Sequence, residues 1–175
     1  MLTARLCSLF LISQTLIALA ASAGILSTSI LAPFGTQTAV KASTSLTVLL
    51  LSLGLATGEG RWRRRWAGLS LTVVVVTAFS WGTSVPPLQF ADWNSDPRPA
   101  PSTMLCLGLL SVALWHRGRQ AVCVTTTTAI VIGLSVARLF FWAPAEAPFA
   151  SVALLTLMWL LTMCYGLAHE MREHG

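Results

Sequence analysis

Long apolar stretches separated by short polar segments run the whole length of the chain. Most of them hold about 20 residues, the length that an α-helix needs to cross a hydrocarbon layer roughly 30 Å thick. The run Val73–Val76 would favour a strand in water, but between these apolar flanks it indicates a lipid-facing helix. The pattern predicts an all-α, integral membrane six-helix bundle, a single transmembrane domain over residues 1–175, with spans at about 6–32, 40–57, 67–83, 102–115, 121–142 and 149–168.

Composition excludes several other classes of protein. Hydrophobic residues make up 55% of the chain and charged residues 10%, whereas about 25% of a soluble domain is charged, so we expect no separate soluble domain. The four cysteines lie in apolar stretches and form no CxxC pair, which indicates small buried residues rather than a disulfide, redox or metal site. We therefore expect no cofactor. The cysteines are Cys7, Cys106, Cys123 and Cys164.

The distribution of basic residues predicts the orientation of the bundle. Loops on the cytoplasmic side of a membrane carry the excess of Lys and Arg. If the N-terminus is inside, the inner segments hold most of these residues, so both chain ends are predicted to be cytoplasmic (N-in and C-in). The inner set is Arg5, Arg61, Arg63, Arg64, Arg65, Arg117, Arg119 and Arg172, and the outer set is Lys41 and Arg98.

Four arginines bracketed by two tryptophans follow the second predicted span. Tryptophan prefers the headgroup level of a bilayer, and clustered arginines attract anionic lipid heads. We expect this cluster to anchor the bundle at the membrane interface, and we expect no nucleic-acid partner at such a surface. The cluster is Arg61, Trp62, Arg63, Arg64, Arg65 and Trp66.

The longest polar interruption, the outer loop 85–101, is the first candidate for a signal or ligand region. It holds the carboxylates Asp92 and Asp96, the aromatic Trp93, and Arg98. Trp93 would fold the loop back as an apolar cover over the helix ends.

Two residues within the predicted spans extend this candidate region. Arg138 either snorkels to the outer interface or pairs with Glu146, Asp92 or Asp96, because a charge inside a membrane needs water or a partner. Trp159 lies near the middle of the last span, away from the interfaces where tryptophan gathers, and either packs in the core or lines a cavity.

No catalytic constellation is visible, so we expect no enzyme activity. His169 and His174 are five residues apart, which does not fit the H-E-x-x-H spacing of a zinc site, and a solvated helix end explains them and Glu170. The run Thr125–Thr128 either satisfies its hydroxyls on its own helix or lines a watery path.

The chain also shows an internal similarity. The segment from Ser43 matches the segment from Ser102 at a constant offset, through Leu51 and Leu110 to Leu55 and Leu114. We interpret this as a sign of three repeated two-helix units.

The first apolar stretch has an alternative interpretation, a cleaved signal peptide that ends near Ala21-Ser22-Ala23.

The sequence around the fourth predicted span resembles the multi-helix membrane input (sensor) modules of bacterial diguanylate cyclases and histidine kinases. In many of these a stretch like P-G-R-M-S-P-N-T-A-L leads into a leucine-rich helix. Arg98, Pro101, Thr103 and Leu105 match it, Ser102 stands for the asparagine, and Gly108 follows in the leucine-rich run, whereas Asp96-Pro97, Pro99-Ala100 and Met104 depart from it.

The resemblance implies a multi-pass protein of the bacterial inner membrane that relays a signal through its last helix. The relay would act on a cytoplasmic output domain or partner, or within a homodimer, because this chain holds no cyclase or kinase domain. The alternatives are a small transporter or channel and a structural subunit of a membrane complex.

Overall fold

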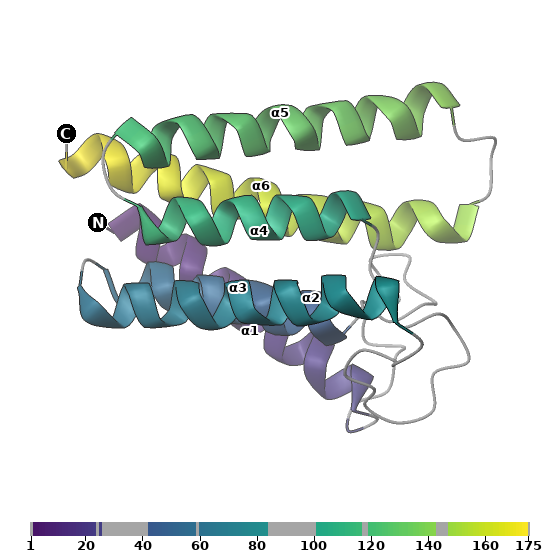
Figure 1. Ribbon diagram of the computed structural model, residues 1–175, viewed down its shortest axis with the longest axis horizontal. Helices are drawn as coiled ribbons and strands as arrows, with labels where there is room; N and C mark the ends of the chain where they lie inside the picture. The colour runs from purple at the N-terminus through teal and green to yellow at the C-terminus, as the bar shows by residue number, and fades with distance from the viewer. Residues whose placement is uncertain are drawn as a thin grey trace.

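Six α-helices and no β-strands make up the part of the chain that the structure describes, which confirms the predicted all-α class with six helices. The computed structural model describes the backbone of residues 2–23, 25, 42–58, 60–83, 101–116, 119–142 and 147–174. The helices are α1 (Leu2–Ser22), α2 (Ala42–Ala56), α3 (Arg61–Gly82), α4 (Pro101–Trp115), α5 (Arg119–Trp142) and α6 (Ala147–His174) (Figure 1).

Three helices differ in extent from the predicted spans. α3 begins at Arg61, so the arginine–tryptophan cluster forms its first turns instead of preceding it. α6 continues to His174 instead of ending near 168. α1 ends at Ser22, and residues 26–41 lie outside the described part of the chain, as do residues 85–100 of the outer loop, whose last residue, Pro101, begins α4.

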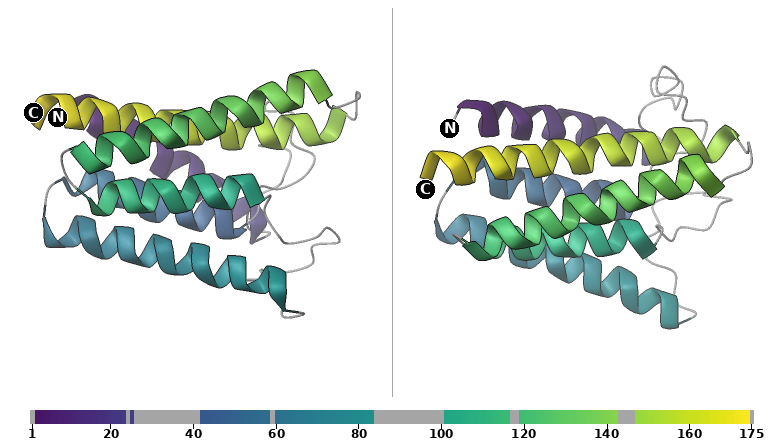
Figure 2. Two further views of the ribbon diagram at one scale, coloured as in Figure 1. Left: turned by 45° about the horizontal axis from the view of Figure 1, so that its top comes forward. Right: turned by 90° about the horizontal axis from the view of Figure 1, so that it is seen from above.

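Successive helices run in opposite directions, and both chain ends lie at the same end of the bundle (Figures 1 and 2). The starts of α1 and α3 and the last turns of α6 meet there. These segments carry every charged residue whose side chain the structure describes: Arg5, Arg61, Arg63, Arg64, Arg65, Glu170 and Arg172. We call this end the arginine-bearing end.

Three helices form the inside of the bundle and three lie around them. The inner helices α2, α4 and α6 all contact one another, whereas each outer helix lies between two of them: α1 against α6 and α2, α3 against α2 and α4, and α5 against α4 and α6. Glycine lets the inner helices approach closely, because a Cβ on Gly54 would collide with Leu114 and one on Gly166 would come within 2.8 Å of Leu55 Cδ2.

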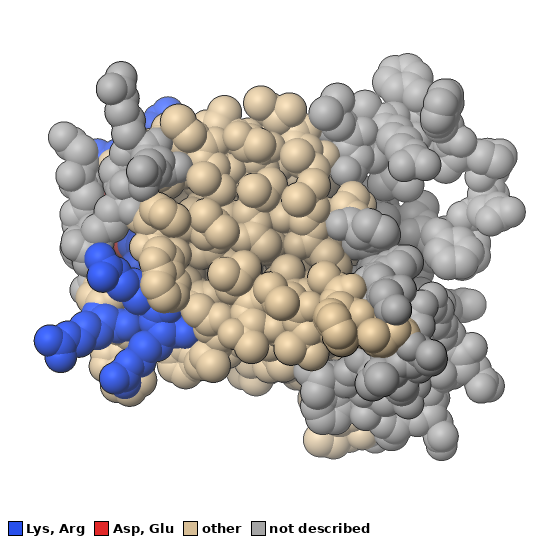
Figure 3. All heavy atoms as spheres, viewed as in Figure 1, with Lys and Arg blue, Asp and Glu red and all other residues tan. Residues whose placement is uncertain are grey.

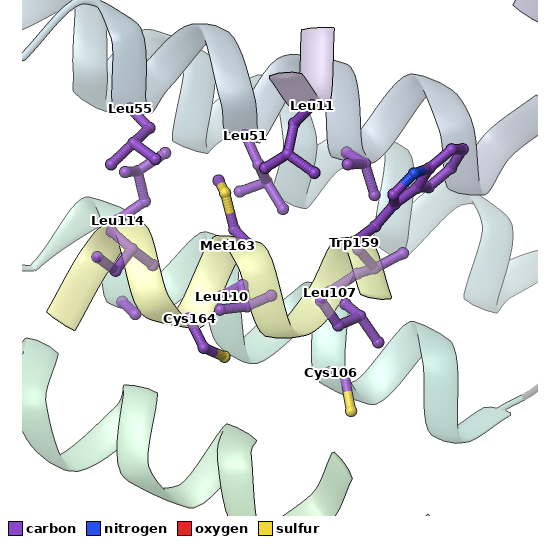
Figure 4. Close-up of a cluster of buried hydrophobic side chains, with 14 of the residues drawn as sticks. Leu11, Leu51, Leu55, Cys106, Leu107, Leu110, Leu114, Trp159, Met163 and Cys164 are labelled. Atoms are coloured by element: carbon purple, nitrogen blue, oxygen red, sulfur yellow. The ribbon is translucent and has the colours of Figure 1, made fainter. Parts of the chain in front are cut away.

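The core combines leucines with hydroxyl groups that need no outside partner. Leucines from the inner helices meet around Met163 and Trp159 of α6 (Figure 4). The buried hydroxyls of Thr47 and Ser52 donate hydrogen bonds to carbonyls four residues earlier in their own helix, at 2.7 and 2.6 Å. A hydroxyl satisfied in this way can be buried without a partner on another helix.

Candidate functional site

The first turns of α3 direct one arginine into the bundle. Arg61, Arg64 and Arg65 share one face of the helix and are exposed, whereas Arg63 points the other way and is only 6% exposed. Arg63 begins the buried stripe of α3, which continues at helical spacing through small side chains. That stripe is Ala67, Ser70, Val74 and Thr77.

Arg63 joins α3 to two inner helices. Its Nη1 donates a hydrogen bond to Oε1 of Glu170 in α6 at 2.8 Å, which is also an ion pair, and its Nε donates to the backbone oxygen of Leu114 in α4 at 3.0 Å. Both charged side chains are 7% exposed. One guanidinium therefore holds the ends of α4 and α6 together, and we call this arrangement the Arg63–Glu170 clasp.

The Leu114 oxygen is available because of its place in α4. The last four carbonyls of a helix have no amide partner inside the helix, and Leu114 is the next-to-last residue of α4. A cation at this position also lies at the negative end of the helix dipole. The guanidinium thus donates to a backbone acceptor at the helix end and to a buried carboxylate at the same time.

The carboxylate of Glu170 is only half satisfied. Its Oε2 is buried and accepts no hydrogen bond from the described part of the chain. A buried ion pair recovers the cost of desolvation only when its remaining lone pairs and protons are also paired. The described contacts of Glu170 therefore come from Arg63, and this buried pair specifies the position of the last turns of α6.

The other arginines of the cluster and Trp62 face outward, whereas Trp66 is half-buried. Trp62 is exposed and lies 6.5 Å from Trp66 between ring centroids, and the guanidinium of Arg65 lies 4.9 Å from the Trp62 ring. This geometry is typical of a cation–π contact. The cluster that we predicted to be one interface anchor is thus divided, with Arg63 inside the bundle and the rest of its arginines at the surface.

The residues predicted for the signal region are not brought together in the described part of the structure. Asp92, Trp93, Asp96, Arg98 and Glu146 lie outside the described residues. Arg138 belongs to α5, but its side chain is outside the described part, so its pairing stays a prediction.

Trp159 is described and packs in the core. Its side chain is 0% exposed and leaves α6 on the same side as Met163, the side on which Leu11 and Leu51 lie (Figure 4).

The threonine run of α5 also had two open interpretations. Thr125 and Thr128 donate hydrogen bonds to the oxygens of Ala121 and Val124 at 2.7 and 2.8 Å, so these two hydroxyls are satisfied on their own helix.

Sequence reasoning missed the role of Glu170. We expected it at a solvated helix end, but it is 5% exposed because α6 continues past 168 and turns this residue inward. A signal for it exists in the sequence: Glu170 follows Met163 and Leu167 at helical spacing, so it shares the core-facing stripe of α6.

No protein family, no curated protein and no solved structure matches this chain. The resemblance to bacterial input modules consequently remains a prediction that rests on the quoted residues.

Proposed function

We propose that this chain is a membrane-embedded input module of a bacterial signalling system, in which the last helix relays a signal to a cytoplasmic output domain or partner. The observation that carries the proposal is the Arg63–Glu170 clasp. It joins the final turns of the longest described helix, α6, to α3 through a buried ion pair, and the same guanidinium donates a hydrogen bond to α4.

A bilayer location is supported by the outer surface of the bundle. Large apolar side chains are exposed on helix faces away from the core, whereas buried positions include many serines and threonines. On the face shown in Figure 3, arginines gather at one end and the middle of the surface carries none. The exposed large apolar residues are Leu2, Leu6, Leu9, Phe10, Leu16, Ile25, Trp62, Leu69, Val75, Val76, Phe79, Leu105, Trp115, Val122, Ile130, Leu161 and Tyr165.

Helix length supports a bilayer location for the outer helices and α6. α1, α3, α5 and α6 hold 21, 22, 24 and 28 residues, which reaches the roughly 17–25 residues of a spanning helix. α2 and α4 hold 15 each. By apolar length alone, one described helix qualifies as a span, Leu2–Ala21, and because it lies near the N-terminus a signal sequence would pass the same test.

The arginine-bearing end is the cytoplasmic end in this proposal. Arginines concentrate on the inner side of membrane proteins, and here the start of α3 and the last turn of α6 carry them together. The C-terminal turns of α6 would therefore project toward the cytoplasm of a bacterial inner-membrane protein, where an output domain or partner can contact them.

The clasp gives the relay a physical basis. A signal can move α6 only if it favours one of two packings of that helix. Breaking a buried ion pair costs several kcal/mol, so such pairs favour one discrete arrangement over intermediate ones. A second arrangement of α6 that gives Oε2 of Glu170 a hydrogen-bond donor would offset part of that cost.

The test fuses a diguanylate cyclase catalytic domain to Gly175 and measures cyclic di-GMP in cells. Glu170→Gln removes the ion pair while keeping size and polarity. We expect it to change output at least fivefold, about the lower limit for coupling between two states. Arg64→Gln, which removes an exposed arginine from the same turn, should leave output unchanged.

Equal output from both variants at equal membrane levels would contradict the relay. Release of the chain from membranes by alkaline carbonate would contradict the membrane location.

A further inference from the structure

A groove separates α5 from α6 at the arginine-bearing end. Its volume is about 480 Å³, within the roughly 300–1,000 Å³ range of small-ligand sites. The first three turns of α5 form one wall with Val122, Thr126 and Ala129, and the last turns of α6 form the other with Tyr165, Ala168 and Arg172.

The groove is apolar along its length and cationic at one end. Ala129 and Ala168 leave the space open, while Val122 and Tyr165 are exposed, so the groove opens on the outer side of the bundle. Arg172, its charged lining residue, is exposed and lies in the last turn of α6. An elongated molecule with an apolar tail and an anionic head matches this combination.

The surroundings favour an anionic head over a neutral one. The exposed Arg61, Arg64 and Arg65 lie at the same end of the bundle as Arg172. Among the side chains that the structure describes at this end, Glu170 is the one carboxylate, and it pairs with Arg63 and not with Arg172. Anionic lipid heads bind clusters of this kind at a bilayer surface.

We propose that this groove binds one anionic phospholipid of the inner leaflet, with an acyl chain between Ala129 and Ala168 and the phosphate at Arg172. The inference rests on the membrane location in the proposed function and adds an effector to it.

The same turns of α6 serve both the groove and the clasp. Met163, Leu167 and Glu170 face the core, whereas Ala168 and Arg172 line the groove. A lipid on one side of this segment therefore acts on the helix that Arg63 holds from the other side. Occupation of the groove would bias the position of α6 and hence the relay.

The test is native mass spectrometry of the full chain in detergent with phosphatidylglycerol, and with phosphatidylcholine of the same acyl chains. We expect one phosphatidylglycerol per chain and no phosphatidylcholine at the same concentration. Arg172→Gln should weaken retention about fivefold, because one arginine near an anionic surface contributes about 1 kcal/mol. Arg64→Gln is the matched control: Arg64 lies at the same end of the bundle but does not line the groove, so its loss should weaken retention less than Arg172→Gln does.

Two further variants test the walls of the groove. Ala168→Phe fills it from α6 and Ala129→Phe from α5, and both should abolish retention. Ala129 is exposed, so Ala129→Phe keeps the test valid if Ala168→Phe fails to fold.

Equal weakening by Arg64→Gln and Arg172→Gln would overturn the proposal in favour of diffuse attraction. Retention of lipid by Ala129→Phe would overturn it, as would a lipid-free dimer, which would place a second copy in the groove. Each of these outcomes leaves a membrane-inserted chain and so differs from carbonate release, which contradicts the proposed function itself.

Discussion

The inner helices α2 and α4 differ from the third inner helix, α6, in length and in charge. α2 and α4 hold 15 residues each and no charged residue, and they bury leucines at matched positions: Leu51 and Leu110, Leu55 and Leu114. α6 holds 28 residues and carries Glu170 and Arg172 in its last turns. The inner helices α2 and α4 thus bury leucines in the same way, and the extra length of α6 holds the charged contacts.

The largest expected effect comes from removing the charge that α2 and α4 lack. Glu170→Leu leaves Arg63 buried without its carboxylate and should lower the free energy of unfolding by about 3–5 kcal/mol. The measurement is SDS-induced unfolding in mixed micelles, followed by circular dichroism. The control is Arg64→Leu, in the same turn of α3 as Arg63. It should change the free energy of unfolding by less than about 0.5 kcal/mol, as substitutions of exposed residues usually do.

A double variant distinguishes the cost of an unpaired buried charge from the cost of lost packing. Arg63→Met with Glu170→Leu removes both charges, and replacement of a buried pair by apolar residues is often neutral or stabilising. We therefore expect the double variant to regain most of the loss. A double variant as unstable as Glu170→Leu would show that the loss comes from packing instead of an unpaired charge.

A middle-sized effect distinguishes the glycine of α6 from that of α4. Gly166→Ala brings a Cβ within 2.8 Å of Leu55 Cδ2 and 3.4 Å of Cys7 Cβ, and overpacking of this kind should cost about 1–2 kcal/mol. Gly108→Ala meets only Val74 Cγ1 at 3.6 Å, so it should be neutral or stabilising through helix propensity. The same unfolding assay compares them, and equal losses would refute the close approach of α6 to α1 and α2.

The smallest effect tests the similarity of α2 and α4 themselves. Ser52 and Ser111 occupy matched positions. Ser52 donates to the oxygen of Val48 in its own helix, whereas Ser111 accepts a hydrogen bond from Ser70 of α3 at 2.8 Å. Ser111→Ala should cost about 0.6 kcal/mol, the average for a hydrogen bond between membrane helices. Ser52→Ala should cost less in the same assay, and a reversed order would contradict the assigned contact.

Residues on regular helix faces were predictable and those with long-range partners were not. The apolar stretches indicated helices where α2, α4 and α5 lie, within two residues at each end. The clasp was not predicted, because Arg63 and Glu170 are 107 residues apart and each belongs to a polar run typical of solvated chain. Arg63 and Glu170 lie at helical spacing from buried neighbours, and this spacing indicates that both are buried. It can be used only when α3 is known to begin at Arg61 and α6 to continue to His174.

The sequence by itself determined the all-α class and the alternation of helices, since long apolar runs and local hydrogen bonding depend only on neighbouring residues. The tertiary structure decided which helices lie inside, which arginine of the cluster is buried, and which carboxylate it meets. These depend on how helices distant in the chain pack, and burial then selects charge partners because an unpaired charge in the interior is costly.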